Sequence, residues 1–172
     1  PGLPVSTVTG HAGCLLLGRL ARQDVLLMQG RVHFYEGYTP QQITLPIRLM
    51  QRLGVQVLII TNAAGGINKA FHAGDLMLIT DHINFLGLAG VHPLRGPNDD
   101  RFGSRFPEMS RAYDPELLEL ARTVARQQGI TLREGVYAAV SGPTPVWASS
   151  AGAVAVTIGR MSASRSAISS SR

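Results

Sequence analysis

The chain has 172 residues, 45% of them hydrophobic and 16% charged, which is typical of a globular protein with a sizeable core. The formal net charge of +5 suggests a nucleic-acid partner, but residues 145–172 supply three of these charges and basic residues do not cluster with aromatic ones, so we predict none. No apolar run reaches the ~18 residues that span a membrane, and the single cysteine, Cys14, indicates a reducing, cytoplasmic setting.

The apolar pattern predicts strands that alternate with helices, an order typical of an α/β fold with a mixed β-sheet flanked by helices. The predicted strands cover residues 25–28, 55–61, 76–80 and 136–140. Two helices are predicted after the N-caps Thr39 and Asp114, each followed by proline, and they end near Gly54 and Gly129. Residues 81–105 keep neither a helical nor a strand period and are predicted to form a long loop.

The segment after the first predicted strand combines several reactive side chains. GRVHFYEGY, at residues 30–38, contains Arg31, His33, Tyr35 and Glu36 within six positions. An arginine presents a planar fork of donors that suits an oxyanion such as phosphate, and a histidine can gain or lose a proton near neutral pH. This segment therefore predicts an anion site with acid–base capacity.

A second candidate segment, TNAAGG at residues 61–66, follows the strand predicted at 55–61. We predict that it forms a turn of small residues, where backbone N–H groups can approach an anion or a flat ring. Ligands of α/β sheets bind beyond the ends of strands, so Arg31 and Asn62 are expected at such a site.

Five motifs occur in one order along the chain: GRVHFYEGY, TNAAGG, GDLMLITDHIN, HPLRGPNDDRFG and FPEMSRAYD. In order and spacing they resemble the trimeric purine nucleoside phosphorylases over residues 3–144. The resemblance implies a nucleoside phosphorylase-like fold and a role in purine salvage. The implied reaction is phosphorolysis of purine (deoxy)ribonucleosides to the free base and (deoxy)ribose 1-phosphate. It also implies a homotrimer, with inorganic phosphate as co-substrate and no cofactor.

The resemblance also implies roles for individual residues. Those expected to contact phosphate are His11, Arg31, Val32, His33 and Ala63. Those expected to contact the nucleoside are Tyr35, Asn62, Ala63, Ala64 and Phe106. We expect His33 and Glu36 to form the catalytic pair, in which Glu36 orients the imidazole, and Phe106 to reach the pocket of a neighbouring subunit. Asp99 and Asp100 are interpreted as a solvated turn, so no metal site is predicted.

The sequence departs from the family pattern near both ends. It begins inside the pattern, after the glycine-rich, serine-bearing loop that helps the family to hold phosphate. Pro145 and Val146 stand where the family has an aromatic residue and the glutamate that reads the purine. We therefore predict a partial nucleoside phosphorylase domain over residues 1–144 and a divergent, disordered tail over 145–172.

Within this tail, only residues 151–158 have the apolar spacing of a strand, and residues 162–172 are rich in serine. Two interpretations stay open. The chain is a truncated purine nucleoside phosphorylase, or it is a catalytically inactive fragment that retains only phosphate binding or an interaction role. A methylthioadenosine phosphorylase shares the fold but is disfavoured, because NAAGG and GRVHFYEGY follow the purine nucleoside pattern.

Overall fold

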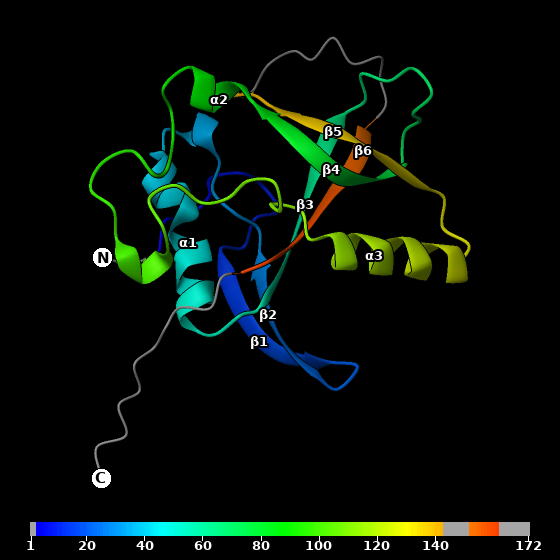
Figure 1. The fold of residues 1–172 in the computed structure, drawn as a ribbon, viewed down its shortest axis with the longest axis horizontal. Coiled ribbons are helices and arrows are strands. Elements are labelled where there is room, and N and C mark those ends of the chain that lie inside the picture. The colour runs from blue at the N-terminus through cyan, green and yellow to red at the C-terminus, as the bar shows by residue number, and fades with distance from the viewer. Residues whose placement is uncertain (1–2, 143–151, 162–172) are drawn as a thin grey trace. The chain divides into compact units, whose positions relative to one another are not determined.

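The computed structural model describes residues 3–142 and 152–161, and these form two compact units (Figure 1). The first unit contains the chain up to Gln56 together with Gly90–Arg105. The second contains Val57–Ala89 and the described residues between Phe106 and Met161. No helix in the described ranges is both long enough and apolar enough to cross a bilayer.

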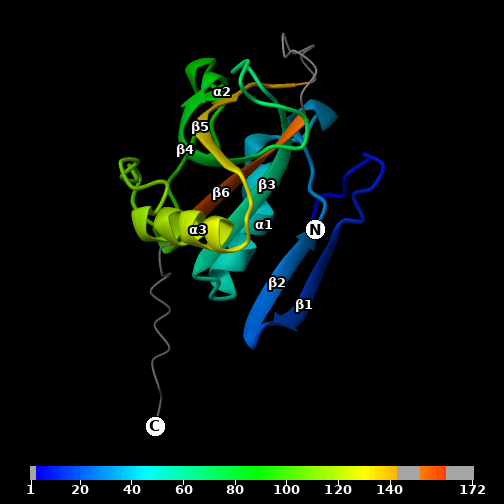
Figure 2. The same cartoon turned by 90° about the vertical axis from the view of Figure 1, so that its right-hand side faces the viewer.

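The first unit contains an antiparallel hairpin of β1 (Cys14–Leu20) and β2 (Gln23–Gln29), the paired blue strands in Figure 2. Its two turn residues, Ala21 and Arg22, have φ angles of 47° and 69°. Positive φ at both central positions is characteristic of a two-residue type I′ turn. The sequence predicted a strand only over 25–28, because this turn lacks the glycine or asparagine that usually marks a hairpin.

The helix predicted in the first unit is confirmed as α1 (Pro40–Arg52), between the short 3-10 turns η1 (Phe34–Glu36) and η2 (Asp100–Phe102). The Thr39 hydroxyl accepts from the Gln42 N–H at 3.3 Å, and Gln42 Oε1 accepts from the Thr39 N–H at 2.8 Å. This reciprocal cap satisfies two backbone donors that a helix start leaves unpaired. Beyond the helix, Gly54 has a φ of 88°, as expected for a helix-ending glycine.

The second unit is built on a four-stranded mixed sheet in the order β3-β6-β4-β5. The strands are β3 (Val57–Gly65), β4 (Leu76–Asn84), β5 (Leu132–Ala139) and β6 (Gly152–Arg160). β6 pairs antiparallel with β3 and parallel with β4, and β4 also pairs parallel with β5. The helices of this unit are α2 (Phe85–Leu88) and α3 (Pro115–Gln127). The predicted mixed sheet flanked by helices is confirmed.

Two predictions about loops are wrong in this unit. The predicted turn at 61–66 is mostly strand, because β3 continues to Gly65 in register with β6. The predicted loop at 81–105 begins instead with the last residues of β4 and with α2. The register of β4 against β5 shifts between Ile79 and Asp81, and such an irregularity breaks the alternation by which a strand is recognised.

The strand suggested by the apolar spacing of 151–158 is present as β6, an interior strand of the sheet. Ala155 of β6 is fully buried and packs with Met77 and Ile79 of β4. The partly buried residues around this core are Ala64, Phe71, Tyr113 and Tyr137. The disorder predicted for 162–172 concerns residues outside the described ranges, and the domain boundary at 144 stays a prediction.

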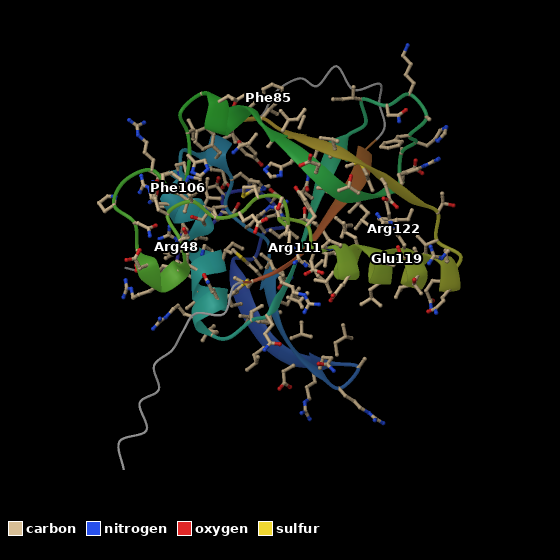
Figure 3. The ribbon with its side chains drawn as sticks, in the orientation of Figure 1. Arg48, Phe85, Phe106, Arg111, Glu119 and Arg122 are labelled. Carbon is tan, nitrogen blue, oxygen red and sulfur yellow. The ribbon has the colours of Figure 1, made fainter. Side chains whose placement is uncertain are left out.

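Helix α3 is tied to the sheet through its charged side chains. Asp114 caps the helix by accepting from the N–H groups of Glu116 and Leu117, at 3.0 and 3.1 Å. Figure 3 shows Glu119 and Arg122 on this helix, where their side chains pair at 3.3 Å. Arg122 Nε also donates to Glu134 of β5 at 2.8 Å, so the helix and the edge strand are linked directly.

Candidate phosphate-binding site

The segment after β2 positions most of the residues predicted to bind phosphate. Gly30 ends the hairpin with a φ of 83°, and Arg31 and Val32 lead into η1. Val32 is only 2% exposed and therefore anchors the segment in the first unit. Its neighbours Arg31 and His33 are half-buried. The burial of one residue thus holds two polar side chains at the margin of the core.

His33 and Glu36 form a pair within η1. Glu36 Oε1 accepts from the His33 backbone N–H and contacts the ring Nδ1, both at 2.7 Å. The Glu36 side chain is 3% exposed and the His33 side chain 21% exposed. The sequence predicted that Glu36 would contact the His33 ring, and the structure places the two side chains in that arrangement.

Residues near the N-terminus complete the shell around the Glu36 carboxylate. The Ser6 hydroxyl lies 3.1 and 3.0 Å from the two carboxylate oxygens. The Thr7 N–H and hydroxyl donate to Glu36 Oε2 at 2.7 and 3.0 Å. Burial alone would raise the pKa of Glu36, but the hydrogen bonds from Thr7, His33 and Ser6 outweigh it and lower the pKa from 4.5 to about 2.

The low pKa of Glu36 determines which ring nitrogen of His33 carries a proton. An ionised carboxylate can only accept hydrogen bonds, so His33 Nδ1 must be the donor in their contact. His33 Nε2 is then the atom left for a ligand. It accepts a hydrogen bond when the imidazole is neutral and donates one when the ring is protonated. The Nε2 atom is therefore suited to bind an oxyanion in either its protonated or its deprotonated form.

The rings of His11 and Tyr35 both lie next to the His33 ring. The ring centroids of His11 and His33 are 4.8 Å apart, and those of His33 and Tyr35 are also 4.8 Å apart, with a 14° angle between the latter two planes. His11 Nδ1 lies 2.7 Å from the Arg31 carbonyl oxygen and 3.1 Å from the Arg31 backbone nitrogen, so the ring is tied to the Arg31 backbone. Tyr35 is 47% exposed. Five residues predicted from the sequence therefore gather in one place: His11, Arg31, His33, Tyr35 and Glu36.

The remaining predicted residues belong to the second unit. Asn62, Ala63 and Ala64 lie on β3, where alternation turns Asn62 and Ala64 toward the core side and leaves Ala63 exposed. Asn62 Nδ2 donates to the Ala63 carbonyl at 3.0 Å and to the Tyr137 hydroxyl at 3.3 Å. Phe106 is 85% exposed. The binding roles of these residues stay predictions.

Sequence reasoning missed three residues that contact the predicted ones: Ser6, Thr7 and Tyr137. Ser6 and Thr7 precede Glu36 by 30 and 29 residues, and Tyr137 follows Asn62 by 75. No periodic pattern in the sequence predicts contacts between residues so far apart in the chain. Asp99 caps the short turn η2 and pairs with Arg101 Nε at 2.8 Å, and the hydrogen bond from the Arg101 guanidinium lowers the pKa of Asp99 to about 2.

Residues 1–145 match the family described as the phosphorylase superfamily. The chain belongs to this superfamily, and within it to the purine nucleoside phosphorylase family. The resemblance given by the five motifs is thereby confirmed. The histidine, arginine and glutamate gathered around η1 all lie within the matched residues.

Three similar proteins illustrate this relationship. Purine nucleoside phosphorylase 1 of Bacillus subtilis is 57% identical over 144 residues, which cover 84% of this chain and 52% of that protein. Isoform 2 of the Schistosoma mansoni enzyme, solved with cytosine and ribose-1-phosphate, is 51% identical with a TM-score of 0.77, covering 83% of this chain and 50% of that one. A Schistosoma mansoni purine nucleoside phosphorylase solved with inosine is 42% identical with a TM-score of 0.75, covering 83% and 51%. The chain thus spans about half the length of these relatives.

Proposed function

We propose that this chain carries the phosphate-binding part of a purine nucleoside phosphorylase. The reaction is reversible phosphorolysis of purine (deoxy)ribonucleosides to the free base and (deoxy)ribose 1-phosphate. The observation that carries the proposal is the His33–Glu36 pair, flanked by His11 and preceded by Arg31. Relatives solved with inosine and with ribose-1-phosphate support both the substrate and the product class.

Each polar group around η1 has a role in this reaction. The Arg31 guanidinium and His33 Nε2 hold inorganic phosphate, with His11 beside them. A phosphate oxygen forms the new bond to C1′ as the bond from C1′ to the purine nitrogen breaks, and the electron pair of that bond leaves with the base. The anionic phosphate stabilises the positive charge that develops on the sugar, and the phosphate site thereby contributes directly to catalysis.

The nucleoside contacts follow from the family resemblance. We assign the exposed ring of Tyr35 to the ribose, and Asn62, Ala63 and Ala64 to the base and phosphate. Phe106 completes the pocket of a neighbouring subunit in a homotrimer of the whole protein. The proposed setting is the cytoplasm, and the proposed role is purine salvage.

A second candidate function is phosphate binding without turnover. One observation favours it: Pro145 and Val146 occupy the places where the family has an aromatic residue and the purine-reading glutamate. Loss of one charge-assisted contact costs ~1.5–3 kcal/mol, or roughly ten- to a hundredfold in rate. This candidate predicts that Arg31 and His33 still bind phosphate while inosine turnover is low.

Calorimetric titration with inorganic phosphate tests the shared part of both candidates. We expect Arg31→Ala to abolish binding and Arg31→Lys to recover only part of it, because lysine lacks the planar fork. Equal phosphate affinity in the original chain and in Arg31→Ala would contradict the site. Inosine and phosphate supplied together then separate the candidates: release of hypoxanthine at ordinary enzymatic rates supports the phosphorylase, and phosphate binding without release supports the second candidate.

A further inference from the structure

The carboxylate of Glu36 divides its two oxygens between two partners. Oε1 receives both contacts from His33, at 2.7 Å each. Oε2 receives the Thr7 N–H at 2.7 Å and the Thr7 hydroxyl at 3.0 Å. One oxygen therefore orients the imidazole while the other is held by a segment 29 residues earlier in the chain. The carboxylate bridges these two segments.

The Ser6 hydroxyl is fixed so that its proton points toward Glu36. Its oxygen accepts from the Val8 N–H at 3.1 Å, which uses one lone pair and restricts rotation of the hydroxyl. The single proton is then shared between the two Glu36 oxygens, at 3.1 and 3.0 Å. Ser6 thus donates to the carboxylate, and its oxygen does not compete with Glu36 for the proton of His33.

We propose that Ser6 and Thr7 are positioning residues, which fix the Glu36 carboxylate so that His33 keeps its proton on Nδ1 and directs Nε2 to the phosphate. The part of this inference that concerns phosphate rests on the proposed function. The part that concerns the His33 proton does not. Neither hydroxyl is placed in contact with the ligand, and both act through Glu36.

The flanking rings cannot perform this task. Tyr35 stacks on the His33 ring and His11 lies next to it, and these two contacts restrict the plane of the imidazole. A rotation of the imidazole by 180° about its last side-chain torsion leaves that plane unchanged but exchanges the positions of nitrogen and carbon atoms. Within residues 3–142 and 152–161, the hydrogen bond to Glu36 Oε1 distinguishes the two orientations. The torsion that orients a glutamate carboxylate is itself broad, and the donors from Ser6 and Thr7 restrict it together with the His33 N–H, which holds Oε1.

The test uses the full chain labelled with ¹⁵N, at pH 8, where an ordinary imidazole with a pKa of about 6.5 is neutral. Imidazole nitrogen spectra, assigned with His33→Gln, report which nitrogen of His33 carries the proton. The key variant is Ser6→Ala combined with Thr7→Val. Thr7→Ser keeps the hydroxyl, and Thr9→Val removes a hydroxyl from the same segment, where Thr9 is exposed and makes no hydrogen bond to Glu36 within the described residues.

We expect the original chain, Thr7→Ser and Thr9→Val to show the proton on Nδ1. The double variant should show a mixture of the two tautomers, together with phosphate affinity weakened about tenfold, the effect of one charge-assisted hydrogen bond. Should the double variant fail to fold, the single variants Ser6→Ala and Thr7→Val give the same readout with a smaller change.

A single Nδ1–H tautomer in a folded double variant would overturn the inference, whatever happens to phosphate affinity, because the effect would then be merely structural. A mixture of tautomers in the double variant supports the positioning role even if the original chain binds no phosphate. In that case the proposed function fails and the role of Ser6 and Thr7 in holding Glu36 stands. The two proposals therefore fail separately.

Discussion

A β-carbon at position 30 would lie 2.6 Å from both Cα and Cβ of His11. Gly30 is thus the residue that allows the end of β2 to pass against His11. The same close approach brings His11 Nδ1 to 2.7 Å from the Arg31 carbonyl oxygen and 3.1 Å from the Arg31 backbone nitrogen. The distance between His11 and Arg31, which are both predicted to bind phosphate, therefore depends on the absence of a side chain at Gly30.

Gly30→Ala should weaken phosphate binding and lower the melting temperature. Gly54 offers a matched control, because its φ of 88° is close to the 83° of Gly30 while a β-carbon there would meet nothing within 4 Å. Both variants carry the left-handed backbone cost of roughly 1–2 kcal/mol. Only Gly30→Ala adds the collision with His11. If phosphate titration shows the same affinity for both variants, the close approach has no role in the site.

Glu36 should make stability depend on pH in a defined window. Its pKa falls from 4.5 to about 2 on folding, because the hydrogen bonds from Thr7, His33 and Ser6 outweigh the effect of burial. Between these values the unfolded carboxyl binds more protons than the folded one, so the free energy of unfolding rises with pH. The contribution is complete above about pH 4.5 and is lost as the pH falls toward 2.

Glu36→Gln removes this titration and leaves the other acids unchanged. The difference in stability between the original chain and the variant should be constant above pH 4.5 and shrink as the pH falls to 2. Urea unfolding at several pH values measures it. A difference that stays constant down to pH 2 would mean that the carboxylate is not stabilised by its neighbours.

The helices α1 and α3 were predictable because their signals are local, whereas the short α2 was not predicted. Thr39 and Gln42 cap α1 from within one turn, and Asp114 caps α3 in the same way. The strands were harder, because their limits depend on partners elsewhere in the chain. β3 extends into the small-residue run only through its pairing with β6, nearly a hundred residues later.

The candidate site likewise combines contacts within one motif, which the sequence predicts, with contacts between distant segments, which it does not. Arg31, His33 and Glu36 share one short motif, so their proximity could be read from the sequence. Ser6 and Thr7 could not be connected with Glu36, because a serine and a threonine in an N-terminal loop have no period or spacing that marks a carboxylate 29 or 30 residues away. Contacts of this kind are decided by tertiary packing.

Tyr137 should control the orientation of the Asn62 side chain. Asn62 Nδ2 donates to the Tyr137 hydroxyl at 3.3 Å and to the Ala63 carbonyl at 3.0 Å, and these two contacts orient the side-chain amide. Tyr137→Phe removes one of these acceptors. We expect the side-chain amide signals of Asn62 to shift in NMR spectra, and any affinity for inosine to fall severalfold.

Tyr113→Phe is the matched control for this prediction. Tyr113 packs against the same core, but its hydroxyl contacts His82 Nδ1 at 3.0 Å and not Asn62. Its loss should leave the Asn62 amide signals in place. Identical spectra of Asn62 in the two variants would show that the hydroxyl of Tyr137 does not orient it.

Residues on opposite faces of β6 should respond differently to added volume. Ala155 is fully buried against Met77 and Ile79, whereas Val154, one residue earlier on the other face, is 37% exposed. Overpacking a filled core costs ~1–3 kcal/mol, and a substitution at a partly exposed position usually changes stability by about 0.5 kcal/mol or less. Ala155→Leu should therefore lower the denaturant midpoint clearly, while Val154→Leu should barely move it.

Because β6 is an interior strand outside the residues matched to the family, this comparison also shows whether it is integral to the folded sheet. Equal midpoints for the two variants would mean that β6 does not pack against β4 in solution.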